Sequence, residues 1–421
     1  MKQIEQIEHI IQDGDLDALA SLYETLKTST DFEMMYDSAL LLASYGFLRE
    51  ADGLYEALLT HLPDEDQLKI DRANTLIELG EEDRALDYLK SIKRGKVEYV
   101  QALLVQADYY QMIGLSETAI EKIKEAYELV PNEPILQFAY AELLLDAGRY
   151  AEAARFYEKL LTQVEAVGDI NIHARLAETY SAGGAYEEAL PYYEKNLEKQ
   201  PSPDDLFGMS FALYQLGQAK DAVKHVNELI DMDPDYYAAY MLKGQCYLAL
   251  EQNDKAYEAF QAGIKRDAYD KALHLSAGKC ALKLGNVAAA EDHLSEALAL
   301  EPDYIEAFIT LGSLYNETEQ DEALLQLTEQ ADIHLVELPL IQSFLAYAYE
   351  RMENYTEAYT KYKMAYNEMQ EDHEFLRAYA NFLIEDGKRT EALPVVKALV
   401  LAYPEDQYWS DFLDVESYEE E

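Results

Sequence analysis

The sequence has few of the residues that support covalent or metal chemistry. Its 421 residues include only two cysteines, Cys246 and Cys280, and contain no Cys-x-x-Cys pair. The two cysteines are 34 residues apart and occupy the same place in adjacent units of the repeat described below. Helices in contact lie about 8 to 10 Å apart, which is wider than a disulfide spans. We therefore expect two reduced, buried thiols, consistent with the cytosol.

Catalytic patterns are also missing. The eight histidines lack the i, i+4 spacing of a helical metal site, and no glycine-rich phosphate loop follows a strand, because no strand is expected. His9, His293 and His373 lie near acidic residues, which a solvated helix face explains better than a ligand set. The many carboxylates single out no pair for acid–base catalysis. The sequence therefore predicts that the protein is not an enzyme and has no cofactor or metal.

Long apolar runs and basic residues are scarce too. No stretch approaches the roughly 18 apolar residues of a membrane span, and the sequence does not open with the basic and apolar segments of a secretory signal. The 34 basic residues face 82 acidic ones, a net charge of −48. Such a surface repels nucleic acid and anionic lipid. We expect a cytoplasmic protein with no nucleic-acid partner and no direct membrane insertion. The charge favours a basic partner, or simply keeps a large array soluble.

The sequence does contain a repeat of about 34 residues. Each unit has two amphipathic helical patterns, and small residues recur at two places twelve positions apart. A larger side chain at either place would hold neighbouring helices apart, because close helix contact needs a short distance between axes. The first series is Ala39, Ala73, Ala107, Ala141, Ala177, Ser210, Gly244, Gly278, Gly312, Ala346 and Ala380. The second series is Ala51, Ala85, Ala119, Ala153, Ala189, Ala222, Ala256, Ala290, Ala323, Ala358 and Ala392.

Three further markers recur with the same period. A glycine recurs in the middle of the unit, an aromatic residue in the second helix and a proline at the end. The glycines are Gly46, Gly80, Gly114, Gly148, Gly184, Gly217, Gly285 and Gly387. The aromatic residues are Tyr55, Tyr157, Tyr193, Phe260 and Tyr362, and the prolines are Pro63, Pro131, Pro201, Pro234, Pro302 and Pro404.

With these markers the chain resembles the tetratricopeptide-repeat (TPR) family along roughly its whole length. The resemblance implies an all-α fold, a right-handed α-solenoid of about eleven to twelve helix–turn–helix units. Three units depart from the pattern, with Glu251, Glu319 and Glu353 in place of the turn glycine, and we expect those turns to close differently. The single tryptophan, Trp409, lies beyond the last repeat.

The register also divides the chain. Two segments break it, and the chain's two ends are expected to cap the stack. The predicted parts are a degenerate capping repeat at 1–31, a first array at 32–161, a joint at 162–169, a second array at 170–404 with an irregular stretch at 317–339, and a C-terminal capping segment with an acidic tail at 405–421. A tolerated loop extension is the alternative to a joint at 162–169.

The resemblance further implies a peptide-binding groove. In the family, first helices line the concave wall, and residues two, five, nine and twelve places into each unit point into it. The matching residues here are Tyr36, Asn74, Asp108, Phe138, Glu142, Arg175, Glu178, Phe207, Phe211, Tyr214, Met241, Gln245, Lys279, Tyr347, Arg377 and Asn381. Their aromatic and acidic side chains suit a peptide carrying Lys or Arg. For any single residue, packing between first helices is the alternative.

We therefore expect a non-catalytic scaffold or adaptor that binds a protein or peptide segment, basic in character, in this groove. The alternative is a chaperone or assembly factor for a client protein. Arg377 with Asn381, and Lys279 with Lys283, are too few to imply the clamp with which some family members hold a C-terminal carboxylate. The sequence leaves the oligomeric state and the choice between groove and convex face open.

Overall fold

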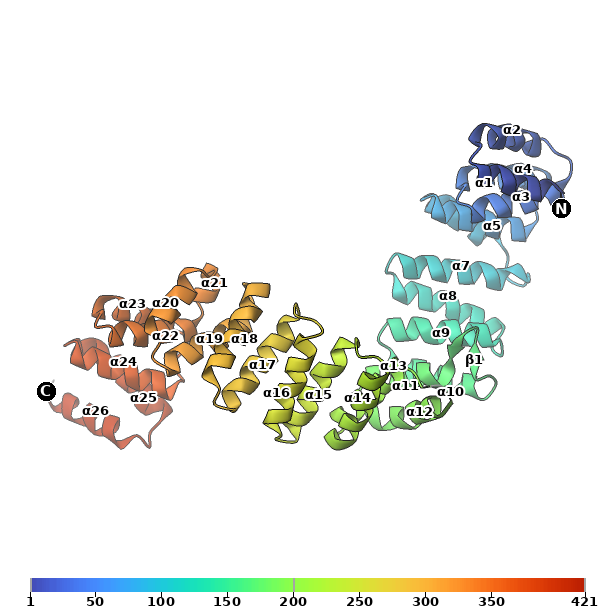
Figure 1. Ribbon diagram of the computed structural model, residues 1–421. Helices are drawn as coiled ribbons and strands as arrows, with labels where there is room; N and C mark the ends of the chain where they lie inside the picture. Colours follow the sequence, from blue (N-terminus) through green and yellow to red (C-terminus); the bar gives the residue numbers. More distant parts are fainter. Residues whose placement is uncertain (1, 200, 420–421) are drawn as a thin grey trace. The chain divides into compact units, whose positions relative to one another are not determined.

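The chain folds almost entirely into helices. The computed structural model describes residues 2–199 and 201–419, and these contain 26 helices and one two-stranded antiparallel sheet (Figure 1). The chain divides into two compact units, Met1–Ala212 and Leu213–Glu421. The predicted all-α fold of paired helices is confirmed, because the described helices, with α21 and α26 set aside, form twelve helix–turn–helix units in sequence order.

In unit 1, odd-numbered helices are the first and even-numbered helices the second of each hairpin. Second helices pack on the first helix of the next hairpin, as α4 does on α5 and α8 on α9. The bounds are α1 Lys2–Asp13, α2 Leu16–Lys27, α3 Phe32–Ser44, α4 Leu48–His61, α5 Asp66–Glu78, α6 Glu82–Ser91, α7 Glu98–Met112, α8 Ser116–Leu129, α9 Pro134–Asp146, α10 Tyr150–Leu161, β1 Ala166–Val167, β2 Ile170–Asn171, α11 Ile172–Ala182, α12 Tyr186–Lys199 and α13 Pro203–Gln215, whose last turn belongs to unit 2.

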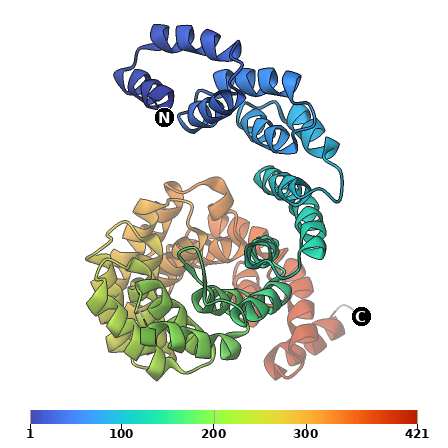
Figure 2. The same cartoon turned by 90° about the vertical axis from the view of Figure 1, so that its right-hand side faces the viewer.

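Unit 2 continues the pattern, and its helices follow one another along an arc (Figure 2). Here α22 and α24 are first helices, because the short α21 is inserted before them. The bounds are α14 Ala219–Met232, α15 Tyr237–Ala249, α16 Asn253–Ile264, α17 Lys271–Lys283, α18 Val287–Leu300, α19 Ile305–Glu317, α20 Asp321–Glu329, α21 Ile333–Val336, α22 Pro339–Arg351, α23 Tyr355–Tyr366, α24 His373–Glu385, α25 Arg389–Ala402 and α26 Gln407–Glu419.

The recurrent small residues lie where helices touch. Every member of the two series is buried except Ala323, which is half-buried in the short α20. Gly244 shows why the size matters, because a Cβ atom there would lie 2.2 Å from Cε1 of Phe260. At Gly278 a Cβ atom would lie 2.8 Å from Cγ of Leu294. The spacing in the sequence is therefore a steric requirement of the hairpins, as predicted.

The three turns with glutamate close in the same way as the glycine turns, so the prediction that they differ was wrong. Gly114 has φ +76° and Glu251 has φ +58°, both in the left-handed region. After Gly114 the amide of Leu115 donates to the carbonyl of Tyr110, and after Glu251 the amide of Gln252 donates to Tyr247. These are the same helix-ending bonds. Hydrogen bonding and packing impose the turn on a residue that tolerates it poorly.

The segment 162–169 and the two residues after it contain the two short strands, which the sequence did not predict. Val167 pairs with Ile170 and Ala166 with Asn171 in an antiparallel hairpin. Val164 and Val167 pack on the core of the preceding hairpins, and Asn171 caps α11 by accepting from the amide of His173 at 2.9 Å. The hairpin therefore replaces the usual proline turn. A bend of the array at this place stays a prediction.

The irregular stretch at 317–339 reflects a shortened second helix. α20 has nine residues, and the four-residue helix α21 occupies the chain between it and α22. Leu335 of α21 is fully buried in the core formed with α19 and α22. The displaced proline, Pro339, begins α22, where its missing N–H costs no helical bond.

Helical segments also lie at the two ends. The capping repeat at 1–31 forms the pair α1 and α2, with Ile7 and Leu19 buried, and Met1 lies outside the described residues. In α26, Trp409 is 1% exposed within the last core, whereas Tyr408 is 64% exposed and does not pack as expected. The predicted acidic tail lies mostly within α26, whose side chains are described only up to Leu413.

The two cysteines are free and buried, as predicted. The histidines are less scattered than the sequence suggests, because Nδ1 of His274 lies 3.4 Å from Nδ1 of His293. Nε2 of His274 lies 3.3 Å from the carbonyl oxygen of Ala268, which can only accept, so this nitrogen donates. Nε2 of His293 lies 3.2 Å from the hydroxyl oxygen of Tyr257. The two rings thus join a chain of polar contacts between α16, α17 and α18.

Substitution of Gly244 by alanine should destabilise the protein, because the new Cβ would overlap the ring of Phe260. We expect a loss of about 1 to 3 kcal/mol, the usual cost of overpacking. Denaturant titration followed by circular dichroism measures it. Phe260→Leu in the same protein should recover part of the loss, and an unchanged midpoint for Gly244→Ala would contradict the steric account.

Replacing Glu251 by glycine should stabilise the protein. A residue with a side chain loses about 1 to 2 kcal/mol in the left-handed conformation, and glycine avoids this cost. The greater freedom of glycine in the unfolded chain offsets about half of that gain. We expect a net gain of about 0.5 to 1 kcal/mol in the same titration. The reverse change, Gly285→Glu at a turn with φ +72°, should lose a similar amount. Loss of stability in Glu251→Gly would show that the carboxylate holds the turn.

Stability should fall as the pH drops below about 6.5, the ordinary pKa of histidine. Burial, and then the charge of His274, lower the pKa of His293, against the weaker pull of Asp292 and Glu296. A lowered pKa means that the unfolded chain binds protons more readily, so acid favours unfolding. Melting temperatures between pH 7.5 and 5.5 should drop less in His293→Gln than in the wild type. The exposed His9→Gln serves as control and should not reduce the drop.

Candidate interaction surface on the first helices

The residues predicted to line a groove share one structural place. All sixteen lie on first helices, from Tyr36 on α3 to Asn381 on α24, and none of them is fully buried. Some of them, such as Phe138 and Tyr347, also pack against the hairpin cores, whose buried positions on the first helices are filled by residues such as Ala107. We call the face that they occupy the first-helix surface and describe it separately for each unit.

In unit 1, successive first helices are joined by contacts between residues 33 to 35 positions apart. Tyr36 O–H donates to Asp71 at 2.8 Å, and the amide of Gln111 donates to Asp146. Nε of Arg175 donates to Glu142 at 2.9 Å. The sequence analysis missed Asp71, Gln111 and Asp146. The signal that could have found them is the repeat length itself, because it brings residues one repeat apart face to face.

Four of the predicted residues form one cluster where α9 meets α11. Glu142 accepts from Arg175 and from Tyr157 of α10, and Arg175 also donates to Glu178 at 2.8 Å. The hydrogen bond to Glu142 is the main cause that raises the pKa of Arg175, which stays charged. Phe138 packs edge-on against the ring of Tyr157, with centroids 6.1 Å apart. The only arginine of this surface in unit 1 is thus neutralised by two carboxylates.

Three other carboxylates on this surface have no basic partner. Asp71, Asp108 and Asp146 lie on the consecutive first helices α5, α7 and α9, and among the described residues none of them forms an ion pair. Asp71 and Asp146 accept only from neutral groups. The sequences of α3, α7 and α9 contain no Lys or Arg at all. This row of uncompensated charge attracts cations.

Packing around the row perturbs its titration. Burial raises the pKa of the carboxyls of Asp71 and Asp108, although the side chain of Asp108 remains open to solvent. Burial and then the hydrogen bond to Asp71 raise the pKa of Tyr36 to about 12, so its hydroxyl stays protonated and donates. A carboxylate that is partly desolvated gains more from an approaching cation than one in bulk water.

Phe207 and Phe211 lie next to each other on α13. Their rings are stacked with centroids 6.4 Å apart, and Tyr186 of α12 meets Phe211 edge-on at 6.0 Å. Both phenylalanines are half-buried, so one part of each ring packs and the other faces solvent. They add an aromatic platform to the first-helix surface of unit 1.

In unit 2 the predicted basic residues are paired. Lys279 bonds to Glu306, and Arg377 lies 3.7 Å from Asp406 in the loop before α26. Met241 accepts from Ser276 at 3.5 Å, and Tyr347 packs edge-on against Tyr362 at 5.8 Å. The other predicted residues of this unit do not join these contacts: Tyr214 and Gln245 are half-buried and Asn381 is exposed. These residues do not converge into one cluster.

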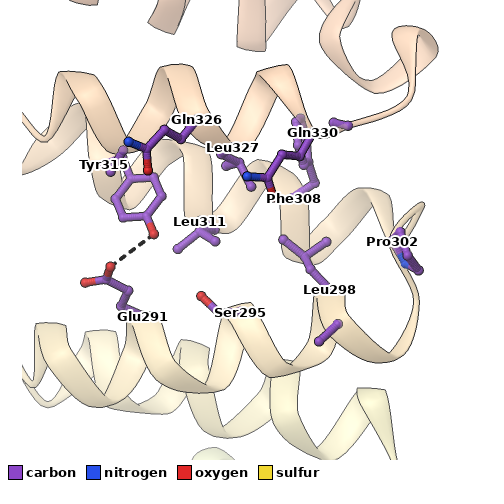
Figure 3. A pocket seen from close by; sticks show the side chains of 13 residues that line it. Glu291, Ser295, Leu298, Pro302, Phe308, Leu311, Tyr315, Gln326, Leu327 and Gln330 are labelled. Carbon is purple, nitrogen blue, oxygen red and sulfur yellow. Dashed lines mark hydrogen bonds between the residues drawn. The ribbon is translucent and has the colours of Figure 1, made fainter.

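Unit 2 also contains a cavity of about 560 Å³ between α18, α19 and α20 (Figure 3). Residues of these three helices, with Pro302, Gln330 and Ala331, surround it. Leu298 and Leu311 line it, and Tyr315 O–H donates to Glu291 across it at 3.0 Å (Figure 3). Burial and this bond raise the pKa of Tyr315 to about 12. Its one carboxylate is thus engaged, and the lining suits an apolar group better than acid–base chemistry.

No described helix combines the length and the apolar character needed to cross a bilayer. Among the described residues, no three His, Cys, Asp or Glu side chains gather in a way that would hold a metal ion.

Comparison with protein families gives several matches. Models of YpiA-like tetratricopeptide repeats match residues 111–164, and models of the YpiA-like C-terminal repeats match residues 339–406. General tetratricopeptide-repeat models match residues 172–204, 212–271 and 247–305. The matches therefore lie in both units and include the turns at Glu251 and Glu353.

Individual proteins and solved structures are similar to parts of the chain. The Hsp70–Hsp90 organizing protein of Triticum aestivum is 28% identical over 89 residues, 21% of this chain and 15% of its own. The crystal structure of YrrB, described as a TPR protein with an unusual peptide-binding site, is 22% identical and covers 44% of this chain and 95% of its own with a TM-score of 0.37. A repeat protein from Parabacteroides merdae covers 60% of this chain and 100% of its own, with 16% identity and a TM-score of 0.40.

A relative of similar length decides the family. The TPR repeat-containing protein YpiA of Bacillus subtilis (strain 168) is 36% identical over 363 residues, which cover 86% of this chain and 86% of the relative. The chain therefore belongs to the YpiA-like family of tetratricopeptide-repeat proteins.

Proposed function

We propose that this protein is a non-catalytic, cytoplasmic scaffold that binds a basic segment of another protein along the first-helix surface of unit 1. The observation that carries the proposal is the row of Asp71, Asp108 and Asp146, which lack a basic partner on three consecutive helices. Burial partly desolvates Asp71 and Asp108, and charges taken out of water are ordinarily paired. A Lys- or Arg-rich segment would supply the missing partners.

The neighbouring aromatic residues suit the rest of such a segment. Tyr36 lies at one end of the row beside Asp71, and Phe138 lies on α9, the helix that carries Asp146. A guanidinium or ammonium group that pairs with a carboxylate can lay its alkyl chain or its charge on an adjacent ring. The residues one repeat apart face each other, so an extended or helical segment crossing α3 to α9 would meet acids and rings in turn.

The competing function is a chaperone or assembly factor that shields an unfinished client. The two functions differ in selectivity and in the effect of salt. A scaffold captures the same one or two folded partners through charge, whereas a chaperone captures many unfolded chains through apolar contact. Exposed charge pairs are screened within about 10 Å at 0.1 M salt, so salt separates the two.

Replacing Asp71 and Asp108 together by asparagine should weaken the binding of a lysine-rich model peptide about three- to tenfold. Each exposed pair contributes about 0.2 to 1 kcal/mol, and asparagine can still accept from Tyr36. Fluorescence anisotropy of the labelled peptide measures the affinity at low salt and again at 0.3 M salt, where the wild type should approach the variant.

The matched control is Glu121→Gln with Glu128→Gln, which removes the same charge from exposed positions of the second helix α8. It should change the affinity by less than about twofold, because those carboxylates lie on a second helix and not on the first-helix surface. Equal losses in both double variants would mean that net charge alone attracts the peptide. Binding that does not respond to salt or to either pair would reject the proposal and favour the chaperone.

A further inference from the structure

A second candidate surface lies on a different edge of unit 1, between α6 and α9. The loop at 92–97 connects α6 to α7 and turns at Gly95, where φ is +98°. Together with the end of α8 and the start of α9, it encloses a cavity of about 620 Å³ that we call the edge pocket. Its lining is Gly95, Lys96, Val97, Val100, Leu104, Leu129, Val130, Glu133, Ile135 and Leu136.

The edge pocket exposes an unusual amount of apolar surface. Val97 is 88% and Ile135 is 59% exposed, and Leu129 and Val130 on the facing end of α8 are also exposed. Isolated apolar residues on a surface are common, but four that line one hollow form a contiguous patch. Such patches on water-soluble surfaces usually mark a place where another molecule binds.

The loop also carries a concentration of positive charge that the rest of the chain lacks. Lys93 and Arg94 directly precede the pocket residues 95–97, and Lys90 lies one turn earlier at the end of α6. All three side chains are exposed, and among the described residues none forms an ion pair. Lys96 does, with Asp66 at 3.7 Å. Four of the 34 basic residues of this acidic protein thus lie within residues 90–96, next to or in the lining of an otherwise largely apolar hollow.

An equivalent pocket two repeats earlier provides a comparison within the same molecule. Leu62, Glu65 and Leu68 line a cavity of about 280 Å³, and they precede Val130, Glu133 and Leu136 of the edge pocket by 68 residues. That earlier pocket has Glu33 in its lining and no Lys or Arg. The two pockets share their apolar character and their place in the fold but have opposite charge surroundings.

We propose that the edge pocket docks a short acidic segment of a partner protein, which places an apolar side chain in the hollow and its carboxylates on Lys90, Lys93 and Arg94. Charge complementarity selects this occupant over a basic segment. A second copy of this chain fits less well, because two molecules of net charge −48 repel each other at long range. Leu104 of this site lies one helical turn before Asp108 of the first-helix surface, so the two sites adjoin on α7 and would let one molecule hold two partners of opposite charge.

The test uses two labelled synthetic peptides, one with Leu and Phe flanked by Asp and Glu, and one with Lys in place of every acid. Fluorescence anisotropy with the full chain should show binding of the acidic peptide. Lys93→Glu with Arg94→Glu should weaken that binding about tenfold or more, because two attractions become repulsions. Val97→Ser should weaken it several-fold without unfolding, because this side chain is already exposed.

Two controls locate the effect. Leu62→Ser in the equivalent pocket should leave the affinity for the acidic peptide unchanged, and Asp71→Asn with Asp108→Asn on the first-helix surface should not weaken it. Failure of the latter variant to affect the lysine-rich peptide would reject the proposed function while leaving the edge pocket intact.

Three results would overturn the inference. The first is that the lysine peptide binds the edge pocket as tightly as the acidic peptide or more tightly. Binding at this pocket is recognised because Val97→Ser abolishes it. The second is an unchanged affinity for the acidic peptide in Lys93→Glu with Arg94→Glu. The third is a dimer of the wild-type chain, observed by sedimentation velocity. If Lys93→Glu with Arg94→Glu dissociates this dimer and the acidic peptide does not, the pocket binds a second copy of the chain.

Discussion

The close approach of neighbouring helices is the constraint on which the rest of this structure depends. Helix axes can come within about 8 to 10 Å only where the side chain between them is small. Gly244 and Gly278 show the limit, because the rings and branched chains of Phe260 and Leu294 already occupy the space that a Cβ would need. Once each hairpin closes in this way, its outer faces become complementary to those of the next, and the array grows by nearest-neighbour contacts.

This regular growth also organises the surface chemistry. Because the repeat length returns each residue to the same face, Tyr36 meets Asp71 and Glu142 meets Arg175 across adjacent first helices. Asp71, Asp108 and Asp146 lie on consecutive first helices, and a pocket at one turn recurs two repeats later. The edge pocket and the equivalent pocket two repeats earlier differ in charge because residues at equivalent places, such as the bases of the loop at 92–97, differ from repeat to repeat.

The same packing tolerates local departures. Glu251, Glu319 and Glu353 adopt the left-handed turn of glycine because the helix-ending hydrogen bonds and the next hairpin over-determine it. The shortened α20 is compensated by α21, which returns Leu335 to the core, and a cavity lies beside Tyr315. The strand pair at 166–171 fills the place of a proline turn with Val164 and Val167. Irregular segments thus preserve the stack and create the features that distinguish one repeat from another.

The sequence by itself determined the all-α repeat, the buried small residues and the helices on which the candidate surface lies. It could do so because steric fit recurs with a fixed period, which a single chain displays many times over. Only the tertiary structure decided which charges are paired. Arg175, Lys279 and Arg377 have acidic partners and Asp108 has none, because pairing depends on side-chain contacts between helices rather than on spacing along one. The glutamate turns, the strand pair and the edge pocket likewise arise from contacts between segments that a periodic pattern does not describe.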